Sequence, residues 1–288
     1  MNKEEFLARI GYDGGRLSKG QRAIADYIYM HYDKAAFMKA ATLAESAGVS
    51  ESTVVRFAIA LGYDGYPDLQ KTLQNIIRNR LTTVQRVEIA GDLSQDEVLE
   101  TVLRADIQNI RRTLEAIDQD DFNRIVEALY AARSVYVLGV RSSAPVAQFL
   151  GYYMGFVLDR VTIVTPGISD VLEQIVRIGE GDLLLGVSFP RYSARTIEAM
   201  RFARRQGAEI IALTDSATSP VGEVADLCLT ARSDMASFVD SLVAPMSVVN
   251  ALMVAMSLRR REQLGEYFTK LEGLWSEIKV YQEGRDEA

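Results

Sequence analysis

Residues 42–63 read TLAESAGVSESTVVRFAIALGY, and this stretch decides the fold of the first part of the chain. Leu43 and Ala47 recur at helical spacing, which predicts a short helix with one buried face. Gly48 follows and suits the left-handed conformation that often ends a helix. Ser50 then stands at the expected N-cap of a second helix, where its hydroxyl can accept a hydrogen bond from a free backbone N–H. The stretch therefore predicts two short helices joined by a tight turn.

The second of these helices has an apolar face and a polar face. The spacing places Val54, Phe57 and Leu61 on the buried face. The layout is typical of a helix-turn-helix, whose second helix enters the major groove with its N-terminal residues against the bases. An ordinary helical hairpin is the alternative, but the small Ala44 and the turn residue Gly48 suit two closely crossing helices. The candidate DNA-binding residues are Ser50, Ser52, Thr53 and Arg56.

Two further helices are expected beside this motif. A short one over 35–38 leads into it, and a longer one over 68–81 follows it. Three bases project from the longer helix, namely Lys71, Arg78 and Arg80. They fit either a solvated face or contacts with the DNA backbone, and the sequence does not choose between these.

Charge is distributed unevenly along the 288 residues, which leave room for about two domains. Residues 1–80 hold 11 Lys/Arg and 9 Asp/Glu, whereas residues 81–288 hold 21 and 30. A slightly basic head on an acidic body has the right asymmetry for DNA binding. Because the excess of bases in the head is small, we expect dimerisation, or a higher homo-oligomer, to supply enough phosphate contacts.

Several classes of protein are excluded or disfavoured. The single cysteine, Cys228, permits no disulfide framework, and the start MNKEEFLARIG lacks the apolar core of a signal peptide. Both features predict a cytoplasmic protein. Residues 241–258 carry no charge, but Pro245 and Asn250 favour a buried helix over a membrane span. No membrane association is therefore expected.

The pattern of apolar residues changes after a predicted linker at 81–95. A long helix to about residue 117 and another over 118–132 come first. Helical stretches then alternate with short apolar runs at 135–140, 161–165, 182–188, 209–215 and 226–231. Such alternation predicts a doubly wound parallel sheet, here with a core at about 134–232. The predicted domains are thus an all-α head at 1–80 and an α/β unit at 96–288.

Two predicted strand ends carry hydroxyls and arginines just before a helix. The candidate effector-binding residues are Arg141, Ser142 and Ser143 after the first strand, and Ser188, Arg191 and Ser193 after the third. Free N–H groups and the helix dipole favour an anion at such a place, and arginine can grip a phosphate or carboxylate through two hydrogen bonds. Ordinary N-capping by Ser143 and Ser193 is the alternative. Two such loops in one sheet favour anion binding.

The chain resembles an RpiR-type transcriptional regulator, with an N-terminal helix-turn-helix and a C-terminal SIS (sugar isomerase) domain. LAESAGVSESTVVRFAIALGY (43–63) is similar to the family's DNA-binding signature, and LGVRSSA (138–144) and VSFPRYSARTI (187–197) are similar to the two SIS loops. Ser143 falls on the family's serine in the first loop, whereas Arg141 stands where glycine is common. In the second loop Pro190 and Arg191 replace the usual serine and glycine.

The resemblance implies an effector-controlled regulator that binds double-stranded operator DNA and senses a phosphorylated sugar or a related anion. The alternative is a sugar-phosphate isomerase with an accessory helix-turn-helix domain. Aldose–ketose isomerisation needs a positioned base; Glu173 and Glu223 are acidic candidates, and His31 belongs to the head. No catalytic residue, cofactor or metal is expected. The sequence does not distinguish a repressor from an activator.

Overall fold

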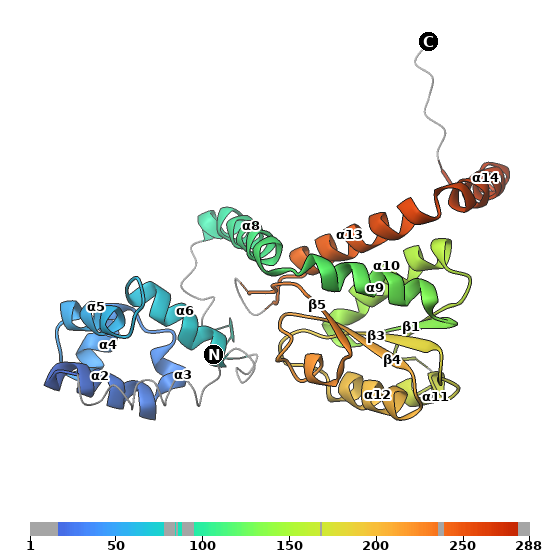
Figure 1. Cartoon of the computed structure of the whole chain (residues 1–288). Helices are drawn as coiled ribbons and strands as arrows, with labels where there is room; N and C mark the ends of the chain where they lie inside the picture. The colour runs from blue at the N-terminus through green and yellow to red at the C-terminus, as the bar shows by residue number, and fades with distance from the viewer. Residues whose placement is uncertain are drawn as a thin grey trace, which may run out of the picture. The chain divides into compact units, whose positions relative to one another are not determined.

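The computed structural model describes residues 17–77, 84, 86–87, 95–167, 169–235 and 239–281. The chain divides into two compact units, Met1–Leu93 and Ser94–Ala288 (Figure 1). Of the predicted linker, Val84, Arg86 and Val87 have helical backbone. The candidate phosphate-contacting residues Arg78 and Arg80 lie outside the described residues.

The described part of the N-terminal unit is helical. Its helices are α2 (Lys19–Met30), α3 (Tyr32–Ala35), α4 (Ala40–Ala47), α5 (Glu51–Ala60) and α6 (Tyr66–Ile77). The prediction of a short helix over 35–38 is wrong, because α3 ends at Ala35. The loop carbonyls after it are taken by side chains of α6: Tyr66 Oη donates to Met38 O at 2.6 Å and Gln74 Nε2 to Ala36 O at 3.0 Å. Burial raises the pKa of Tyr66 to about 12, so its hydroxyl stays a donor.

The C-terminal unit contains the five predicted strands, all confirmed and all parallel. They are β1 (Ser134–Gly139), β2 (Val161–Val164), β3 (Asp182–Val187), β4 (Glu209–Thr214) and β5 (Leu227–Thr230). Their order in the sheet is β2-β1-β3-β4-β5. The order reverses between β1 and β3, so the crevice beyond the carboxyl ends of these two strands is the topological switch point, where doubly wound folds bind ligands.

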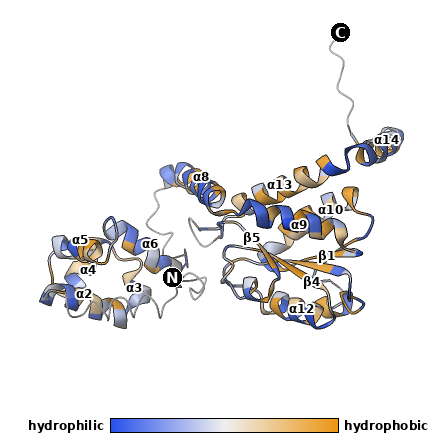
Figure 2. Cartoon of the chain, viewed as in Figure 1, coloured by the Kyte–Doolittle hydropathy of each residue, from blue (hydrophilic) through white to orange (hydrophobic). Residues whose placement is uncertain are grey.

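Helices cover both faces of this sheet (Figure 1). α9 (Gln119–Ala131), α10 (Ala144–Val157) and α13 (Val243–Arg259) lie on one face, whereas α11 (Val171–Gln174) and α12 (Ala194–Arg205) lie on the other. The remaining helices of the unit are α8 (Val98–Ala116) and α14 (Arg261–Glu277). In Figure 2 the strands are coloured mainly as hydrophobic, and α9 and α12 show both classes of residue. A parallel sheet covered on both faces is expected to read this way.

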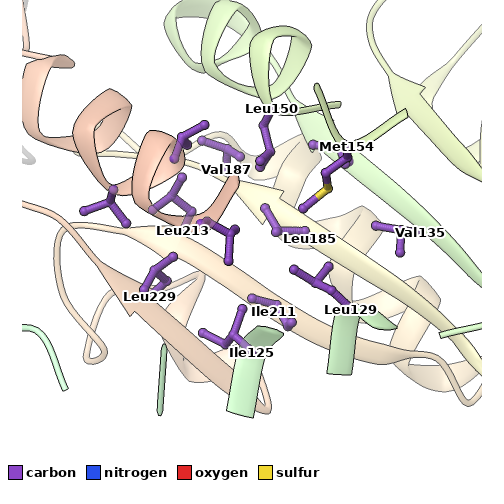
Figure 3. Packing of buried hydrophobic residues seen from close by; sticks show 14 of the residues in the cluster. Ile125, Leu129, Val135, Leu150, Met154, Leu185, Val187, Ile211, Leu213 and Leu229 are labelled. Carbon is purple, nitrogen blue, oxygen red and sulfur yellow. The ribbon is translucent and has the colours of Figure 1, made fainter. Parts of the chain in front are cut away.

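The core splits into two clusters because successive strand residues point to opposite faces. Leu185 and Val187 of β3 pack with α9, α10 and α13 in the cluster of Figure 3. Leu184 of the same strand packs with Met200 and Ala203 of α12 on the other face. β3 is buried along its whole length, which holds the loop after it at a fixed place.

The uncharged run at 241–258 forms a helix, α13, as the sequence predicted, but this helix is buried on one side only, since Val243, Val254 and Leu258 are exposed. Ala244, Val249, Leu252 and Met256 of this helix are buried. Across the described parts of the chain, no helix combines the length and the apolar character that crossing a membrane needs.

Candidate functional sites

α4 and α5 form the predicted helix-turn-helix. Gly48 ends α4 with a left-handed backbone, φ 66°. This conformation costs glycine little and reverses the chain before α5. Leu43 and Ala44 of α4 and Val54 and Phe57 of α5 are buried, so the apolar faces of the two helices turn inward together. The polar start of α5 is left at the surface.

Three of the predicted DNA-binding residues form one hydroxyl cluster at the start of α5. Ser50 stands at the N-cap, but the expected capping bond to a backbone N–H is absent. Its Oγ instead lies 3.0 Å from Ser52 Oγ and 2.8 Å from Thr53 Oγ1. The neighbouring hydroxyls compete successfully for the Ser50 side chain, as local polar groups can at helix ends. Ser50 and Ser52 are exposed, so the cluster offers donors and acceptors to a ligand.

Arg56, the fourth predicted residue, continues the same surface one turn further along α5. Its Nε donates to Ser52 O at 3.3 Å, which lays the side chain back toward the start of the helix. Val55 and Ile59 are 37% and 56% exposed and share this face, and the sequence analysis did not single them out. The sequence could have revealed them, because they lie three and seven residues after Ser52 and therefore on the same helix face. An exposed apolar side chain on a groove-reading helix suits contact with a thymine methyl group.

The loop between β1 and α10 curls tightly over the end of β1. A Cβ on Gly139 would lie 2.7 Å from the carbonyl oxygen of Ser143, so the loop backbone approaches the strand too closely for any other residue. Arg141, Ser142 and Ser143 form a single 3₁₀ turn. Ser143 is buried at the N-cap of α10 without a side-chain capping bond, so the capping alternative fails here.

The loop between β3 and α12 is built by hydroxyls that bind backbone. Ser193 Oγ accepts from Thr196 N at 3.4 Å, so the capping alternative is confirmed for Ser193. Ser188 is buried, and its Oγ accepts from Ser193 N at 3.2 Å. Thr196 in the first turn of α12 is completely buried, and its Oγ1 has no hydrogen-bond partner among the described residues. A buried polar atom without a partner is uncommon and marks a place where a ligand or water is expected.

Both predicted arginines adopt a backbone conformation that normally belongs to glycine. φ is 56° at Arg141 and 66° at Arg191, and both residues are exposed. A left-handed residue other than glycine costs roughly 1–2 kcal/mol. Such strain gathers at functional sites, where a side chain is kept despite its cost. The structure thus explains why glycine suits these two positions and shows that this chain places a guanidinium at each.

The two loops lie side by side, because β1 and β3 are hydrogen-bonded neighbours and both loops follow their carboxyl ends. Tyr192 ties the second loop to the next strand, since its Oη donates to Asp215 Oδ1 at 2.8 Å. A cavity of about 190 Å³ opens beyond β4 and β5, and Asp215, Thr230 and Arg232 are among its lining residues. The predicted anion-binding residues are not among those that line it.

The candidate bases for isomerisation are placed as structural or surface groups. Glu173 Oε2 accepts from Asp170 N at 3.1 Å in a capping box at the start of α11. Glu223 lies exposed in a 3₁₀ turn, and His31 lies between α2 and α3 in the other unit. Within the described residues, no three His, Cys, Asp or Glu side chains are grouped to hold a metal ion.

Comparison with known proteins identifies the family. The model of the rpiR-family helix-turn-helix domain matches residues 4–80, and that of the SIS domain matches residues 128–255. The solved sugar isomerase domain of an RpiR transcription factor from Sphaerobacter thermophilus is 31% identical with a TM-score of 0.59, covering 61% of this chain and 98% of that chain. The chain belongs to the RpiR family of transcriptional regulators. The resemblance read from the sequence is thereby confirmed.

Other relatives match over most of the chain. The HTH-type transcriptional regulator HexR of Pseudomonas aeruginosa is 28% identical over 251 residues, which are 85% of this chain and 86% of HexR. The HexR of Escherichia coli is 28% identical over 267 residues, covering 88% and 89%. The structure of Vibrio vulnificus NanR complexed with ManNAc-6P shares the fold, with 22% identity, a TM-score of 0.57 and coverage of 94% of this chain and 98% of that chain.

Proposed function

We propose that this RpiR-family regulator binds operator DNA through the start of α5 and senses a phosphorylated sugar, or a related anionic metabolite, at the crevice between β1 and β3. The observation that carries the proposal is the pairing of two surfaces in one chain. One is an exposed hydroxyl cluster on a helix-turn-helix, and the other is a pair of hydroxyl- and arginine-bearing loops at the switch point of a doubly wound sheet.

The DNA-binding half of the proposal rests on the exposed face of α5. Ser50, Ser52 and Thr53 supply hydroxyls that bind phosphate oxygens or base edges, while Arg56 supplies the side chain that most often reads guanine. The surplus of bases over acids in residues 1–80 is small, so one head neutralises few phosphates. A homo-oligomer with two heads on a two-fold operator is therefore part of the proposal.

The effector-binding half rests on the two loops. α10 and α12 follow the carboxyl ends of the neighbouring strands β1 and β3 and cover opposite faces of the sheet, so their N-termini flank the crevice from two sides, and helix N-termini favour an anion. Ser143, Ser188 and Ser193 are candidate hydrogen-bonding groups there, together with the exposed Ser142 at the rim. Arg141 and Arg191 supply positive charge. The ManNAc-6P complexed with NanR of Vibrio vulnificus supports a sugar phosphate as the class of ligand.

A regulator is favoured over an isomerase because the two acids that the sequence offered as bases, Glu173 and Glu223, are both placed in other roles. Glu173 is engaged in a capping box, and Glu223 lies exposed in a turn after β4. Proton abstraction next to a carbonyl needs a base within hydrogen-bonding reach of the substrate. We therefore propose a non-enzymatic SIS unit, without a cofactor, acting in the cytoplasm on DNA.

The experiment combines three measurements on the full chain. Glucose 6-phosphate, fructose 6-phosphate and N-acetylmannosamine 6-phosphate are screened by thermal shift, with inorganic phosphate as the reference, since a ligand raises apparent stability by mass action. Binding to DNA from upstream of the gene is measured at fixed salt with and without each compound, and turnover is assayed in parallel. We expect one compound to raise the melting temperature and to change operator affinity, without turnover.

Other outcomes discriminate sharply. Turnover of a sugar phosphate at an enzymatic rate would overturn the regulator in favour of the isomerase. Because coupling is reciprocal, operator DNA must change the affinity of the ligand by the same factor as the ligand changes that of DNA. Equal ligand affinity with and without operator would show that the SIS unit does not control the head.

A further inference from the structure

α8 turns an apolar stripe to the solvent. Its members recur at spacings of four, four, three and four residues, which places them on one face of the helix. They are Leu99, Leu103, Ile107, Ile110 and Leu114, with 73%, 53%, 48%, 38% and 75% exposure. A contiguous exposed row of this kind marks an interaction surface rather than scattered surface leucines.

The polar side of the same helix faces its own unit, which is the reverse of the usual arrangement. Asn109 and Thr113 are buried. Asn109 Nδ2 donates to Asp234 O at 2.9 Å, and Thr113 Oγ1 accepts from Arg232 N at 2.8 Å. These bonds fix the rotation of α8 about its axis. The apolar stripe is therefore held outward by specific polar contacts and is not an accident of a loosely placed helix.

We propose that the stripe is the seam between two copies of this chain, whose α8 helices pack antiparallel about a two-fold axis near Ile107. A two-fold interface requires a surface that is complementary to itself. The stripe meets this requirement, because leucines stand at both ends and Ile107 lies near its middle. Its flank carries two acids and two bases, namely Glu100, Arg104, Arg111 and Glu115. The flank is therefore neutral, and a second copy approaches without net repulsion.

The antiparallel direction follows from where the heads are attached. Each head is joined by the chain to the start of α8, and α8 has 19 residues, which span about 28 Å. Antiparallel packing sets the two starts that far apart, so the two heads are joined at opposite ends of the seam, as two heads on separate half-sites require. Parallel packing would bring both starts together at one helix diameter. This spacing argument rests on the proposed DNA binding, whereas the seam itself does not.

The first test measures the mass of the full-length protein by light scattering. Ile107→Asp places two carboxylates against each other at the two-fold axis, so we expect the mass to fall from twice 32.0 kDa to 32.0 kDa. Val176→Asp is the matched control, since Val176 is 64% exposed near the end of α11 on the other face of the sheet. The control should keep the mass of the unmodified chain. Both sites are exposed, and unchanged circular dichroism checks that each variant folds.

The second test determines direction by cysteine cross-linking in a Cys228→Ser background. Ile107→Cys should form a disulfide between copies, because residues at the axis lie close together. Leu99→Cys and Leu114→Cys should each stay unlinked alone, whereas the chain that carries both should cross-link. Linking of Leu99→Cys with itself would overturn the antiparallel arrangement.

Two outcomes would overturn the seam as a whole. The unmodified chain could be a monomer at all working concentrations, or a dimer could survive Ile107→Asp, which would place the interface elsewhere, for example on α14. A dimer that follows these expectations but binds no upstream DNA would leave the seam standing and remove the proposed function.

Discussion

The start of α5 and the start of α12 are built from the same residue type and are used in opposite ways. At α5, Ser50 bonds to the hydroxyls of Ser52 and Thr53, and the cluster lies at the surface. At α12, Ser193 caps the helix, and the buried Ser188 holds the backbone of Ser193. The hydrogen-bond partner makes the difference. Exposed hydroxyls that bond only to one another can exchange partners, as the proposed contact with DNA requires, whereas hydroxyls that accept from backbone N–H groups fix the shape of the loop where we propose that the anion binds.

The largest expected effect concerns the two hydroxyls of the loop before α12, the buried Ser188 and the half-buried Ser193. Replacing Ser188 and Ser193 together by alanine removes two hydroxyl oxygens that accept from backbone N–H groups, so the loop loses its fixed shape at a cost of about 1–3 kcal/mol in unfolding free energy. We expect the thermal shift from the effective sugar phosphate to disappear, while operator binding measured by gel shift persists.

The control for that pair is Ser247→Ala with Ser257→Ala. These hydroxyls donate to carbonyls of their own helix, α13, at Val243 O and Val254 O, and hold no loop. This variant should keep the full ligand response. A full response in the Ser188 and Ser193 variant as well would place the effector site elsewhere.

The next largest effect concerns DNA binding by the exposed face of α5. Arg56→Ala removes the long cationic side chain from the face of α5, and operator affinity should fall by about 1–3 kcal/mol if the guanidinium reads a base. Fluorescence anisotropy with labelled operator at fixed salt measures the change. Lys71→Ala on α6 provides the comparison. Loss of a side chain that contacts only phosphate should weaken binding to every DNA sequence alike. Unchanged affinity for Arg56→Ala would remove this residue from the interface.

The strained arginines give a smaller effect with an unusual sign. Arg191→Gly relieves the strain of a left-handed backbone, which destabilises the folded chain by roughly 1–2 kcal/mol. Glycine also gives the unfolded chain more conformational freedom, which lowers stability by about 0.4–1 kcal/mol. The unliganded protein should therefore gain up to about 1.5 kcal/mol in unfolding free energy, measured by denaturant titration, while anion binding weakens. Arg201→Gly in the interior of α12 is the matched control and should lose about 1 kcal/mol, since its backbone is helical and its side chain is exposed. A loss of stability at both sites would mean that the arginine backbone is not strained.

Much of the fold was predictable because local patterns agree with the final packing. The five strands, the turn at Gly48 and the helix at 243–259 all follow from spacing and composition. The order of the strands did not, since neighbours in a sheet are chosen by long-range packing. The outward stripe of α8 was equally hidden, because periodicity reveals an apolar face without telling whether it meets the same chain, a second copy or solvent.

The sites were predictable in position and less so in chemistry. Both loops and the start of α5 lie where the sequence predicted, but their roles in binding remain proposals. The bonding of Ser50 and the left-handed backbone at Arg141 and Arg191 depend on neighbours within a few ångströms, which a linear sequence does not specify. Val55 and Ile59 escaped notice because apolar residues are normally assigned to a core.

The smallest expected effect tests the opening comparison most directly, because it changes one hydroxyl at each helix start. Ser193→Ala removes a capping bond and should cost about 1 kcal/mol of unfolding free energy. Ser50→Ala removes only contacts between exposed hydroxyls, so it should cost less than about 0.5 kcal/mol. Denaturant titration of the full chain, followed separately for the two units, measures both. If Ser50→Ala costs as much as Ser193→Ala, the Ser50 hydroxyl caps α5 in solution, and the contrast between an open cluster and a structural cap would not hold. If instead Ser50→Ala leaves stability unchanged but weakens operator binding, the exposed hydroxyls serve DNA alone, and the difference between the two helix starts is one of function as well as of hydrogen bonding.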